Sequence, residues 1–479
     1  MKKVILFLCV FTFAKSYSQT TQDSTKVYKK RVLETTEVDF LSSYYAQTGN
    51  NASVTGGIGT EELSDLTGTI VVSMPLNDDD VLTIDAGFSA YTSASSSNGN
   101  PFDISGASGN GDDDDDDDDR RAAGDVIGSP WVASSGASRS DVWGSLNADY
   151  SHSSDDRNTI WNADVSFATE YDYSSIGFGG GLTMLFNEKN TTVGISAKVY
   201  LDTWRPIYPT ELKAFEDENG NLNQGFFNGI TILDQNGNSS SAWNPTNYKS
   251  IVDKGRNSYS VSLSFSQILN KNAQFSVFLD IVKQQGWLAN PLQRVYFGNV
   301  DNYYIGNASS IPNYTSSTNT DVFQLADDIE RLPSSRLKIP IGVRLNYYLN
   351  EVISLRTYYR YYFDNWGLKS NTVSLEVPIK ISDKFTLYPS FRYYSQTQAD
   401  YFAPYEQNLS TSEFYTSDFD LSKFNANQYG FGISYTDIFS KAHIWKLGLK
   451  SIDFKYNNYQ RNTGLSANYI GLGFKFVMD

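Results

Sequence analysis

Apolar and polar side chains alternate along four consecutive runs between residues 336 and 394. In the first run, RLKIPIGVRLNYYL, the apolar set falls on one side, and Arg336, Lys338 and Arg344 fall on the other. Because successive side chains of a strand point to opposite faces, each run is predicted to be a β-strand with one apolar and one wet face. A soluble sandwich would use shorter strands and cover the apolar face with a second sheet. Strands of about ten residues instead suit a membrane barrel whose apolar face meets lipid. The alternation therefore predicts an all-β fold, a transmembrane antiparallel up-and-down β-barrel.

The first residues have the pattern of an export signal. Lys2 and Lys3 precede an apolar stretch and then small, polar residues, which predicts a signal peptide over residues 1–18. Residues 19–33 are too few for a plug domain and are expected to form a short periplasmic segment. Residues 34–479 are expected to form the barrel.

The composition limits where the protein is expected in the cell and which partners it is expected to bind. Cys9, in the predicted signal peptide, is the only cysteine, so the mature chain is expected to have no disulfide and no thiol chemistry. The rest of the chain has no apolar stretch of about eighteen residues, the length that a transmembrane helix needs. An exported chain of this kind is expected in the outer membrane of a Gram-negative bacterium after signal-peptide cleavage. The net charge of −16 argues against nucleic acid as a partner.

The same alternation recurs along the chain and predicts about sixteen strands, an even number with both termini at one end. Short turns are expected on the periplasmic side, at residues 77–80, 155–158, 187–190, 270–272, 350–351 and 382–384. Long connections are expected to face outward, at about 96–139, 206–255, 287–334 and 403–425.

We do not expect an enzyme. Outer-membrane hydrolases need a histidine as general base near the outer rim or within the barrel. The chain has two, His152 and His443, and both are predicted to lie near periplasmic turns. We interpret them as surface histidines, and neither a catalytic residue nor a cofactor is predicted.

A run of eight aspartates lies within the connection at about 96–139. Carboxylates bind Ca²⁺ or Mg²⁺, but tight sites space their ligands and turn the chain at a glycine, which this run does not do. Like charges repel and extend the chain, so a disordered acidic loop is favoured and no metal site is predicted. A weak cation site remains the alternative, formed by Asp112, Asp113, Asp114, Asp115, Asp116, Asp117, Asp118 and Asp119.

The glycine-rich stretch GFGGG covers residues 177–181. It resembles a phosphate-binding loop only superficially, because it lies inside a predicted strand and no helix follows. Glycine inside a strand is typical of a bend or a close approach, so a structural role facing the lumen is expected.

Charge is distributed unevenly over the predicted wet faces. A basic wall is expected on the strands of the 336–394 region, formed by Arg336, Lys338, Arg344, Arg356, Arg360, Lys380 and Arg392, with Glu376 as the opposing charge. An acidic wall is expected on the first five strands, formed by Glu37, Asp39, Asp85, Asp141, Asp149, Asp164, Glu170 and Asp172. In a closed barrel of about sixteen strands the two walls lie nearly opposite each other. They would set up a transverse field across the lumen that orients dipolar or anionic solutes, unless the charges serve only solvation or pair with loops.

Several blocks along the mature chain carry a family resemblance. They include VTGGIGTEEL (54–63), YLDTWRPIYPTEL (200–212), NPLQRVYF (290–297), LPSSRLKIPIGVRLNYYL (332–349), LRTYYRYYFDNWG (355–367) and LYPSFRYYSQTQADYFAPY (387–405). In these blocks, in this order, the chain resembles a family of Gram-negative outer-membrane β-barrel proteins described as a domain of unknown function. The resemblance implies a barrel in the outer membrane and transfers no catalytic residue.

The functional expectation is a channel or transport barrel for small polar or anionic solutes. The alternative is a non-conducting barrel that acts as a surface scaffold or binds a partner. The expected partners are outer-membrane lipid, the assembly and export machinery, and a surface or periplasmic protein.

Overall fold

The structure is a computed structural model, and it describes residues 30–92, 140–246, 248–251, 254–314, 321–437, 439 and 441–478. The predicted signal peptide, most of the segment 19–33 and the run Asp112–Asp119 lie outside the described residues. No helix among those ranges is long and apolar enough to cross a membrane.

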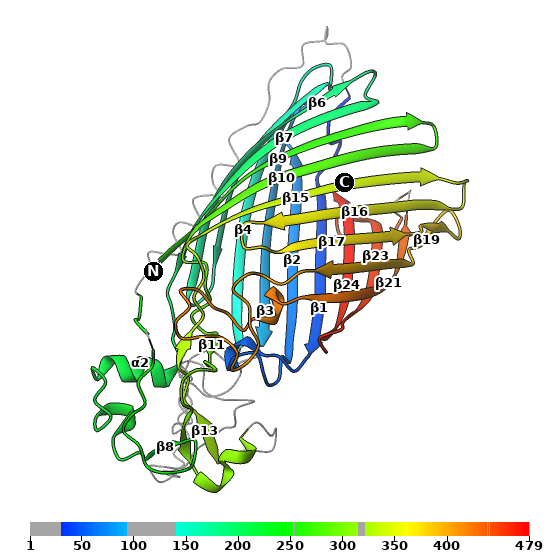
Figure 1. The fold of residues 1–479 in the computed structure, drawn as a ribbon. Coiled ribbons are helices and arrows are strands. Elements are labelled where there is room, and N and C mark those ends of the chain that lie inside the picture. Colours follow the sequence, from blue (N-terminus) through cyan, green and yellow to red (C-terminus); the bar gives the residue numbers. More distant parts are fainter. Residues whose placement is uncertain are drawn as a thin grey trace.

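One large sheet closes on itself into a barrel (Figure 1). The sheet has 19 strands, of which β18, β19 and β22 are short, and the other sixteen form the antiparallel wall. Closure is made by β1, in which Glu37 lies opposite Ser73 of β2 on one side and Val477 of β24 on the other. The predicted transmembrane barrel is confirmed. Its strands are β1 (Glu37–Thr48), β2 (Leu63–Pro75), β3 (Asp80–Thr92), β4 (Ser140–Ser153), β5 (Thr159–Thr169), β6 (Tyr173–Phe186), β7 (Thr191–Trp204), β9 (Lys254–Asn270), β10 (Ala273–Gly286), β15 (Ser335–Tyr348), β16 (Ser354–Asp364), β17 (Lys369–Glu376), β20 (Ser390–Gln396), β21 (Phe424–Thr436), β23 (Leu447–Arg461) and β24 (Ser466–Met478).

Two prolines interrupt strands that were predicted as continuous. After Pro378 the chain continues as β18 (Ile379–Lys380), and before Pro389 it runs as β19 (Phe385–Leu387). Proline has no N–H to donate to the ladder, so regular pairing stops at each of them. The wall is still sealed, because the carbonyl of Pro389 accepts a bond from the Val377 N–H at 3.0 Å.

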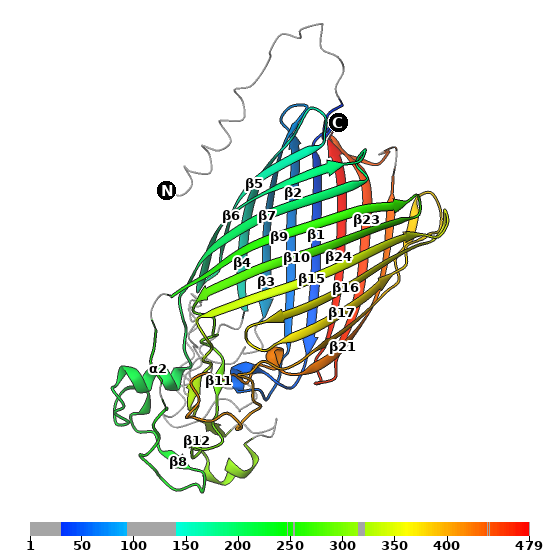
Figure 2. The ribbon, with the colours of Figure 1, turned by 45° about the horizontal axis from the view of Figure 1, so that its top comes forward.

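The two ends of the barrel differ. Short turns and the C-terminal end of β24 share one end, together with the small hairpin that β22 (His443–Ile444) forms with β23 (Figure 2). At the opposite end the strands are joined by longer connections, at 49–62, 205–253, 287–334 and 397–423, and by tight turns at 170–172, 365–368 and 462–465. The arrangement agrees with the predicted long outer loops and short periplasmic turns.

Alternate residues of the wall form an apolar outer face. Exposed side chains on this face include Phe88, Leu146, Val165, Phe178, Ile195, Leu263, Leu345, Val373, Phe431 and Leu472. Leu337, Ile339 and Leu355 fall on the same face by strand register, and neither a second sheet nor a helix covers them in the described ranges. An exposed apolar surface that runs round a closed wall is the surface that lipid covers.

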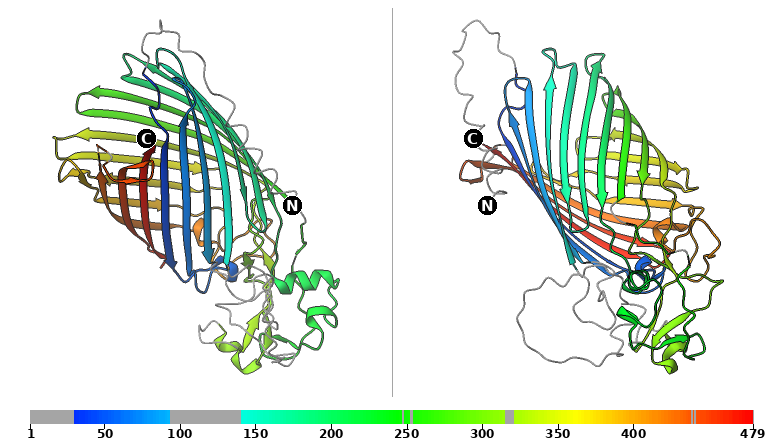
Figure 3. Two further views of the ribbon diagram at one scale, coloured as in Figure 1. Left: turned by 180° about the vertical axis from the view of Figure 1, so that it is seen from behind. Right: turned by 90° about the vertical axis from the view of Figure 1, so that its left-hand side faces the viewer.

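Three outer connections fold together into a cap, here defined as the described residues of 205–253, 287–334 and 397–423 (Figure 3). Its elements are α2 (Thr210–Asp217), β8 (Ile232–Asp234), β11 (Arg294–Val295), β12 (Tyr303–Gly306), β13 (Val322–Gln324), β14 (Asp328–Ile329) and the 3-10 helices η3 (Gly225–Phe227), η4 (Ala308–Asn313) and η5 (Phe419–Leu421). A further 3-10 helix, η2 (Ser53–Thr55), lies in the connection after β1. β8, β12 and β13 make a three-stranded sheet, and β11 pairs with β14.

The cap has its own hydrophobic core. Leu212, Phe227, Trp243, Ile305 and Phe323 are almost completely buried in one cluster, although they come from two different connections. Loops that only joined strands would not bury such side chains, so the cap is a folded unit beyond the strand ends. The sequence predicted long outer loops here, without this unit.

Candidate functional site

The charged lumen is the first candidate site, and strand register defines its face. Arg344 of β15 lies opposite Tyr358 of β16, while the neighbouring Leu345 is exposed on the apolar outer face. Arg360 lies opposite Gly342, so it shares the side of Arg344. Side chains with this parity point into the barrel.

Three arginines of the predicted basic wall are exposed to the interior space. Arg344, Arg360 and Arg392 lie on β15, β16 and β20, and none of them forms an ion pair with a carboxylate among the described residues. The Arg344 guanidinium lies 5.4 Å from the Phe278 ring and 5.7 Å from the Tyr358 ring, which support it without removing its charge. Inward side chains that remain exposed are not packed over by the rest of the described chain.

Other members of the basic wall are paired. Arg356 contacts Glu376 at 2.8 Å, and Lys380 contacts Asp383 at 2.9 Å beside a short turn.

At the outer end of the wall, Arg336 is held against Asp364 at 2.5 Å and lies 4.2 Å from the Trp366 ring. Lys338 lies on the same inward face, directly opposite Asp364 across β15 and β16. Lys338 also has no ion pair among the described residues, but it is half-buried, so the unpaired charge that is exposed to the lumen lies on the three arginines.

Three residues of the predicted acidic wall pair with lysines on nearby strands. Glu37 contacts Lys450 at 2.8 Å and Lys475 at 2.5 Å, and Asp39 lies 3.8 Å from Lys475. Asp164 of β5 pairs with Lys198 of β7 at 3.1 Å across the intervening strand β6.

Two acidic-wall residues accept bonds from neutral amides. Asn147 donates to Asp85 at 3.1 Å, and Asn162 donates to Asp149 at 2.7 Å. Neither carboxylate has a cationic partner among the described residues. Asp141 lies in β4, but its side chain is outside the described residues.

Glu170 and Asp172 are not on the lumen wall, so this part of the prediction is corrected. β5 ends at Thr169, and the chain reverses so that the Glu170 N–H bonds to the Tyr173 carbonyl at 2.8 Å. Both acidic residues therefore belong to a tight turn at the outer end. The prediction continued the fifth strand past Thr169, because the polar residues of the turn continue the alternation.

The glycines of GFGGG allow side chains from both flanking strands to meet over β6. A Cβ at Gly179 would overlap the Asp164 carboxylate and lie 2.8 Å from Lys198 Cε. At Gly181 it would lie 2.7 Å from Asn162 Oδ1. The close approach that the sequence predicted is thus made by wall side chains, and the Asp164–Lys198 pair depends on it.

Sequence reasoning missed several inward charges. Lys198, Lys475, Asp65 and Asp453 share the lumen parity of their strands, as does Lys455. The alternation of each strand indicates these positions, but apart from Asp65, at the outer end of β2, they lie on strands outside the two predicted walls.

The two walls face each other across the lumen. In the ring of sixteen strands, β16 is the eighth strand from β3 in either direction, so the centres of the two walls are diametrically opposite. The unpaired residues Arg344, Arg360 and Arg392 on one side face Asp85 and Asp149 on the other. This arrangement supports a weaker transverse field than the full set of charges would give.

Both histidines lie at the end with the short turns. His152 Nδ1 is 2.6 Å from Asp80 Oδ1, next to the Trp161 ring, and His443 belongs to the β22 hairpin. Across the described part of the chain, no group of three or more His, Cys, Asp or Glu side chains is arranged to hold a metal ion.

Buried charge is concentrated in the cap. Glu211 of α2 and Arg294 of β11 form an ion pair at 3.1 Å, and both side chains are fully buried. Asp327 and Glu330 lie on either side of β14, where burial raises their pKa values to about 7 and about 8. Burial also raises the pKa of Asp328 to about 6, against the opposing effect of Arg331.

The chain belongs to the family described as "Protein of unknown function (DUF3570)", whose model matches residues 6–471. The resemblance drawn from the sequence blocks is confirmed. No curated protein matches the chain.

Comparison with solved structures finds outer-membrane proteins at low sequence identity. A bacterial polysaccharide outer membrane secretin is 10% identical with a TM-score of 0.40, covering 93% of this chain and 99% of that chain. The TodX monoaromatic hydrocarbon channel is 7% identical with a TM-score of 0.37, covering 94% and 91%. A ferric enterobactin receptor of Pseudomonas aeruginosa is 10% identical with a TM-score of 0.37, and the chain covers 54% of it. Likeness at this level concerns the fold and transfers no function.

Proposed function

We propose that the protein is a passive channel of the Gram-negative outer membrane for small anionic or polar solutes. The observation that carries the proposal is the row of Arg344, Arg360 and Arg392, which point inward, are exposed and have no carboxylate partner among the described residues. Unpaired guanidinium groups on one wall lower the energy of an anion at that level. Low-dielectric barrel walls strengthen the effect by focusing the field.

The acidic wall on the opposite side would orient a solute in the lumen. Asp85 and Asp149 accept hydrogen bonds from Asn147 and Asn162 and have no cationic partner among the described residues. A dipolar solute that passes between the two walls would align its negative end with the arginines. The transverse field is thus part of the proposed mechanism.

Charge reversal tests the proposal. Purified protein in a planar bilayer under a KCl gradient is expected to show a reversal potential that indicates preference for chloride. The triple variant R344E, R360E and R392E is expected to move that potential toward cation preference, because each substitution replaces a lumen cation by an anion. A reversal potential that stays at the wild-type value would contradict the proposal.

A matched control separates lumen charge from total charge. Lys213 lies on the exposed surface of α2, where its ion-pair partner is Asp217. The variant K213E makes one such replacement of a cation by an anion outside the lumen and is expected to leave the reversal potential unchanged.

The second candidate is a non-conducting barrel that presents the cap as a surface scaffold. The folded core of the cap favours it, because a pore does not need an independent unit of this kind. Absence of conductance from correctly folded protein would favour this candidate.

The remaining expectations belong to the same proposal. Residues 1–18 would be cleaved as a signal peptide, and outer-membrane lipid and the assembly and export machinery would be partners. A surface or periplasmic protein would be a further partner. Neither nucleic acid binding nor catalysis is part of the proposed function.

A further inference from the structure

The inner wall of the barrel has a trough along β24, where two glycines take the place of larger inward side chains. Gly471 and Gly473 lie on the lumen face, between neighbours on β1 and β23. A cavity of about 350 Å³ opens over them, and its lining also includes Leu41, Asp453 and Lys455. Sites for small ligands have volumes of about 300–1,000 Å³, so the trough can hold a small solute.

The trough exposes apolar surface to the lumen. Leu41 lies directly opposite Gly473 and is 48% exposed. The Tyr469 ring lies across Gly471, since a Cβ at that glycine would be 3.0 Å from the tyrosine hydroxyl and 3.3 Å from two ring carbons. Tyr469 is 39% exposed, so a ring held along the strand in this way turns a face toward the lumen.

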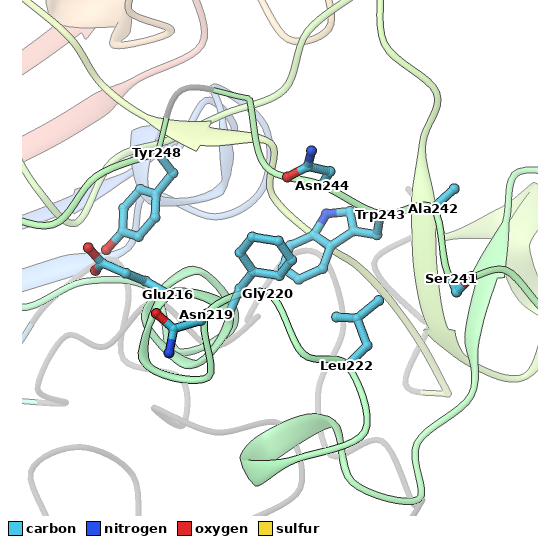
Figure 4. Close-up of a pocket in the computed structure, with 10 residues that line it drawn as sticks. Glu216, Asn219, Gly220, Leu222, Ser241, Ala242, Trp243, Asn244 and Tyr248 are labelled. Atoms are coloured by element: carbon cyan, nitrogen blue, oxygen red, sulfur yellow. The ribbon is translucent and has the colours of Figure 1, made fainter.

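Exposure distinguishes this wall from the larger pocket of the cap, beside α2 (Figure 4). That pocket has about 670 Å³, but its Trp243 ring packs 5.0 Å from Phe215 and 5.2 Å from Phe227 and is only 2% exposed. A ring enclosed in this way supports the cap core and offers no face to a solute.

Polar side chains border the apolar surface of the trough. Lys455 lies directly opposite Gly471, is exposed, and forms no ion pair among the described residues. Asp453 precedes it on the same face of β23. On the other side, Thr67 and Thr69 of β2 line the cavity with hydroxyl groups. All four side chains are at least partly exposed, so a solute in the trough can reach both donors and acceptors.

A second cavity continues the trough toward the outer end of the barrel. It has about 310 Å³ and shares Tyr469 with the first cavity. Its lining includes Tyr45 and the amide of Asn457, each directly opposite Tyr469 on a neighbouring strand. From Leu41 to Tyr45 the strand β1 advances about 13 Å, at about 3.3 Å per residue. The two cavities therefore form an elongated groove, here called the β24 groove.

The side chains of the β24 groove select a solute with an apolar face and a hydroxyl-rich edge. A small inorganic anion would gain Lys455 but would also meet the Asp453 carboxylate. An aromatic carboxylate would pack on Tyr469 and bind Lys455, but it has no donor for Asp453. A sugar ring offers every contact, because its C–H face packs on aromatic and aliphatic side chains and its hydroxyls both donate and accept.

We infer that the β24 groove is a binding site for neutral oligosaccharides, with sugar rings against Tyr469 and Leu41 and their hydroxyls bonded to Lys455 and Asp453. Neutral sugars are then one class of polar solute that the channel passes. Their transport rests on the proposed function, because the groove is reached through the lumen, whereas their binding is measured without a current.

Titration calorimetry on the full-length protein tests the binding. Micelles of a detergent without a sugar headgroup are required, because such a headgroup would compete for the groove. The probes are maltotriose and cellotriose as neutral oligosaccharides and benzoate as an aromatic anion. At least one of the two oligosaccharides is expected to bind. Failure of both to bind, or binding of benzoate in place of them, would overturn the inference.

Variants assign the binding to the groove. Y469A removes the aromatic face and is expected to weaken oligosaccharide binding roughly tenfold, whereas Y469F keeps the ring and is expected to bind like the wild type. K455M keeps an unbranched side chain but removes the donor, and it is expected to weaken binding severalfold. Y358A is the matched control, because Tyr358 also points inward and lies across a glycine, Gly342, on another part of the wall. Binding that Y469A and K455M leave unchanged would contradict the assignment.

Planar-bilayer recordings separate the oligosaccharide site from the proposed channel. The oligosaccharide that binds is expected to reduce the ion current, and Y469A is expected to raise the concentration that gives half of the block. Absence of any current from protein that binds the oligosaccharide would contradict the proposed function and leave the site in place. An open channel to which neither oligosaccharide binds would contradict the site alone.

Discussion

At the scale of single residues, Gly179 controls the packing of the lumen wall over β6. The side chains of Asp164 and Lys198 meet above it, and they leave no room for a Cβ. The pair therefore depends on a residue that carries no charge. A prediction of lumen charge from acidic and basic residues alone misses this dependence.

The variant G179L is expected to destabilise the barrel by about 1–3 kcal/mol, because the larger side chain must displace the ion pair or bend the strand. Urea unfolding followed by tryptophan fluorescence measures the change. Gly144 provides the control, since a Cβ there would meet nothing within 4 Å, and G144A is expected to have little effect. Equal unfolding midpoints for G179L and the wild type would show that the wall tolerates the overlap.

Lumen charges were predicted in part at this scale. Parity along a strand is a local property, so the sequence identified Arg344, Arg360 and Asp149 as inward residues. Pairing is not local, because Lys475 neutralises Glu37 from the other end of the chain. The sequence alone thus overestimates the negative wall.

At the scale of elements, the sequence predicts the strands of the barrel but does not predict the cap. The short turns between strands were predicted within a few residues, because alternation is read along one segment and lipid imposes it all round the barrel. The cap was not predicted, because its core combines Leu212 and Trp243 with Ile305 and Phe323 from a connection further along the chain. Contacts between two distant connections leave no periodic pattern in the sequence.

The buried pair Glu211–Arg294 should be critical for the cap. E211Q leaves the Arg294 charge buried without its partner, which is expected to cost about 3–5 kcal/mol of cap stability. Hydrogen exchange measured by mass spectrometry should show faster exchange in the cap and unchanged exchange in the barrel strands. K213A removes only the exposed pair with Asp217 and is expected to change cap stability by less than about 1 kcal/mol. Similar cap exchange in E211Q and K213A would contradict the role of the buried pair.

The cap should also be less stable at alkaline pH. Asp327 and Glu330 have pKa values raised to about 7 and about 8 by burial, so they are protonated in the folded cap where an unfolded carboxyl is ionised. Their ionisation favours unfolding, and stability falls as pH rises from the unfolded value of about 4 through the folded values. Cap exchange, corrected for intrinsic rates, is expected to be faster at pH 8.5 than at pH 5.5. D327N and E330Q together should flatten that dependence, and a steeper one would contradict the assignment.

At the scale of the whole molecule, the barrel separates lipid from water with a single layer of strands. Each strand contributes one apolar face and one polar face, and β1 closes the ring against β2 and β24. The cap lies beyond the outer ends of the strands, so the lumen and the cap are separate places on one molecule.

Cysteine accessibility in proteoliposomes tests the central claim of a water-filled lumen inside a lipid-facing wall most directly. With Cys9 replaced by serine, R344C and L345C each introduce a single thiol at adjacent positions of β15. A charged, water-soluble maleimide is expected to label R344C rapidly and L345C hardly at all, because one position faces the lumen and the next faces lipid. Equal labelling of both thiols, or labelling of L345C alone, would contradict the open barrel.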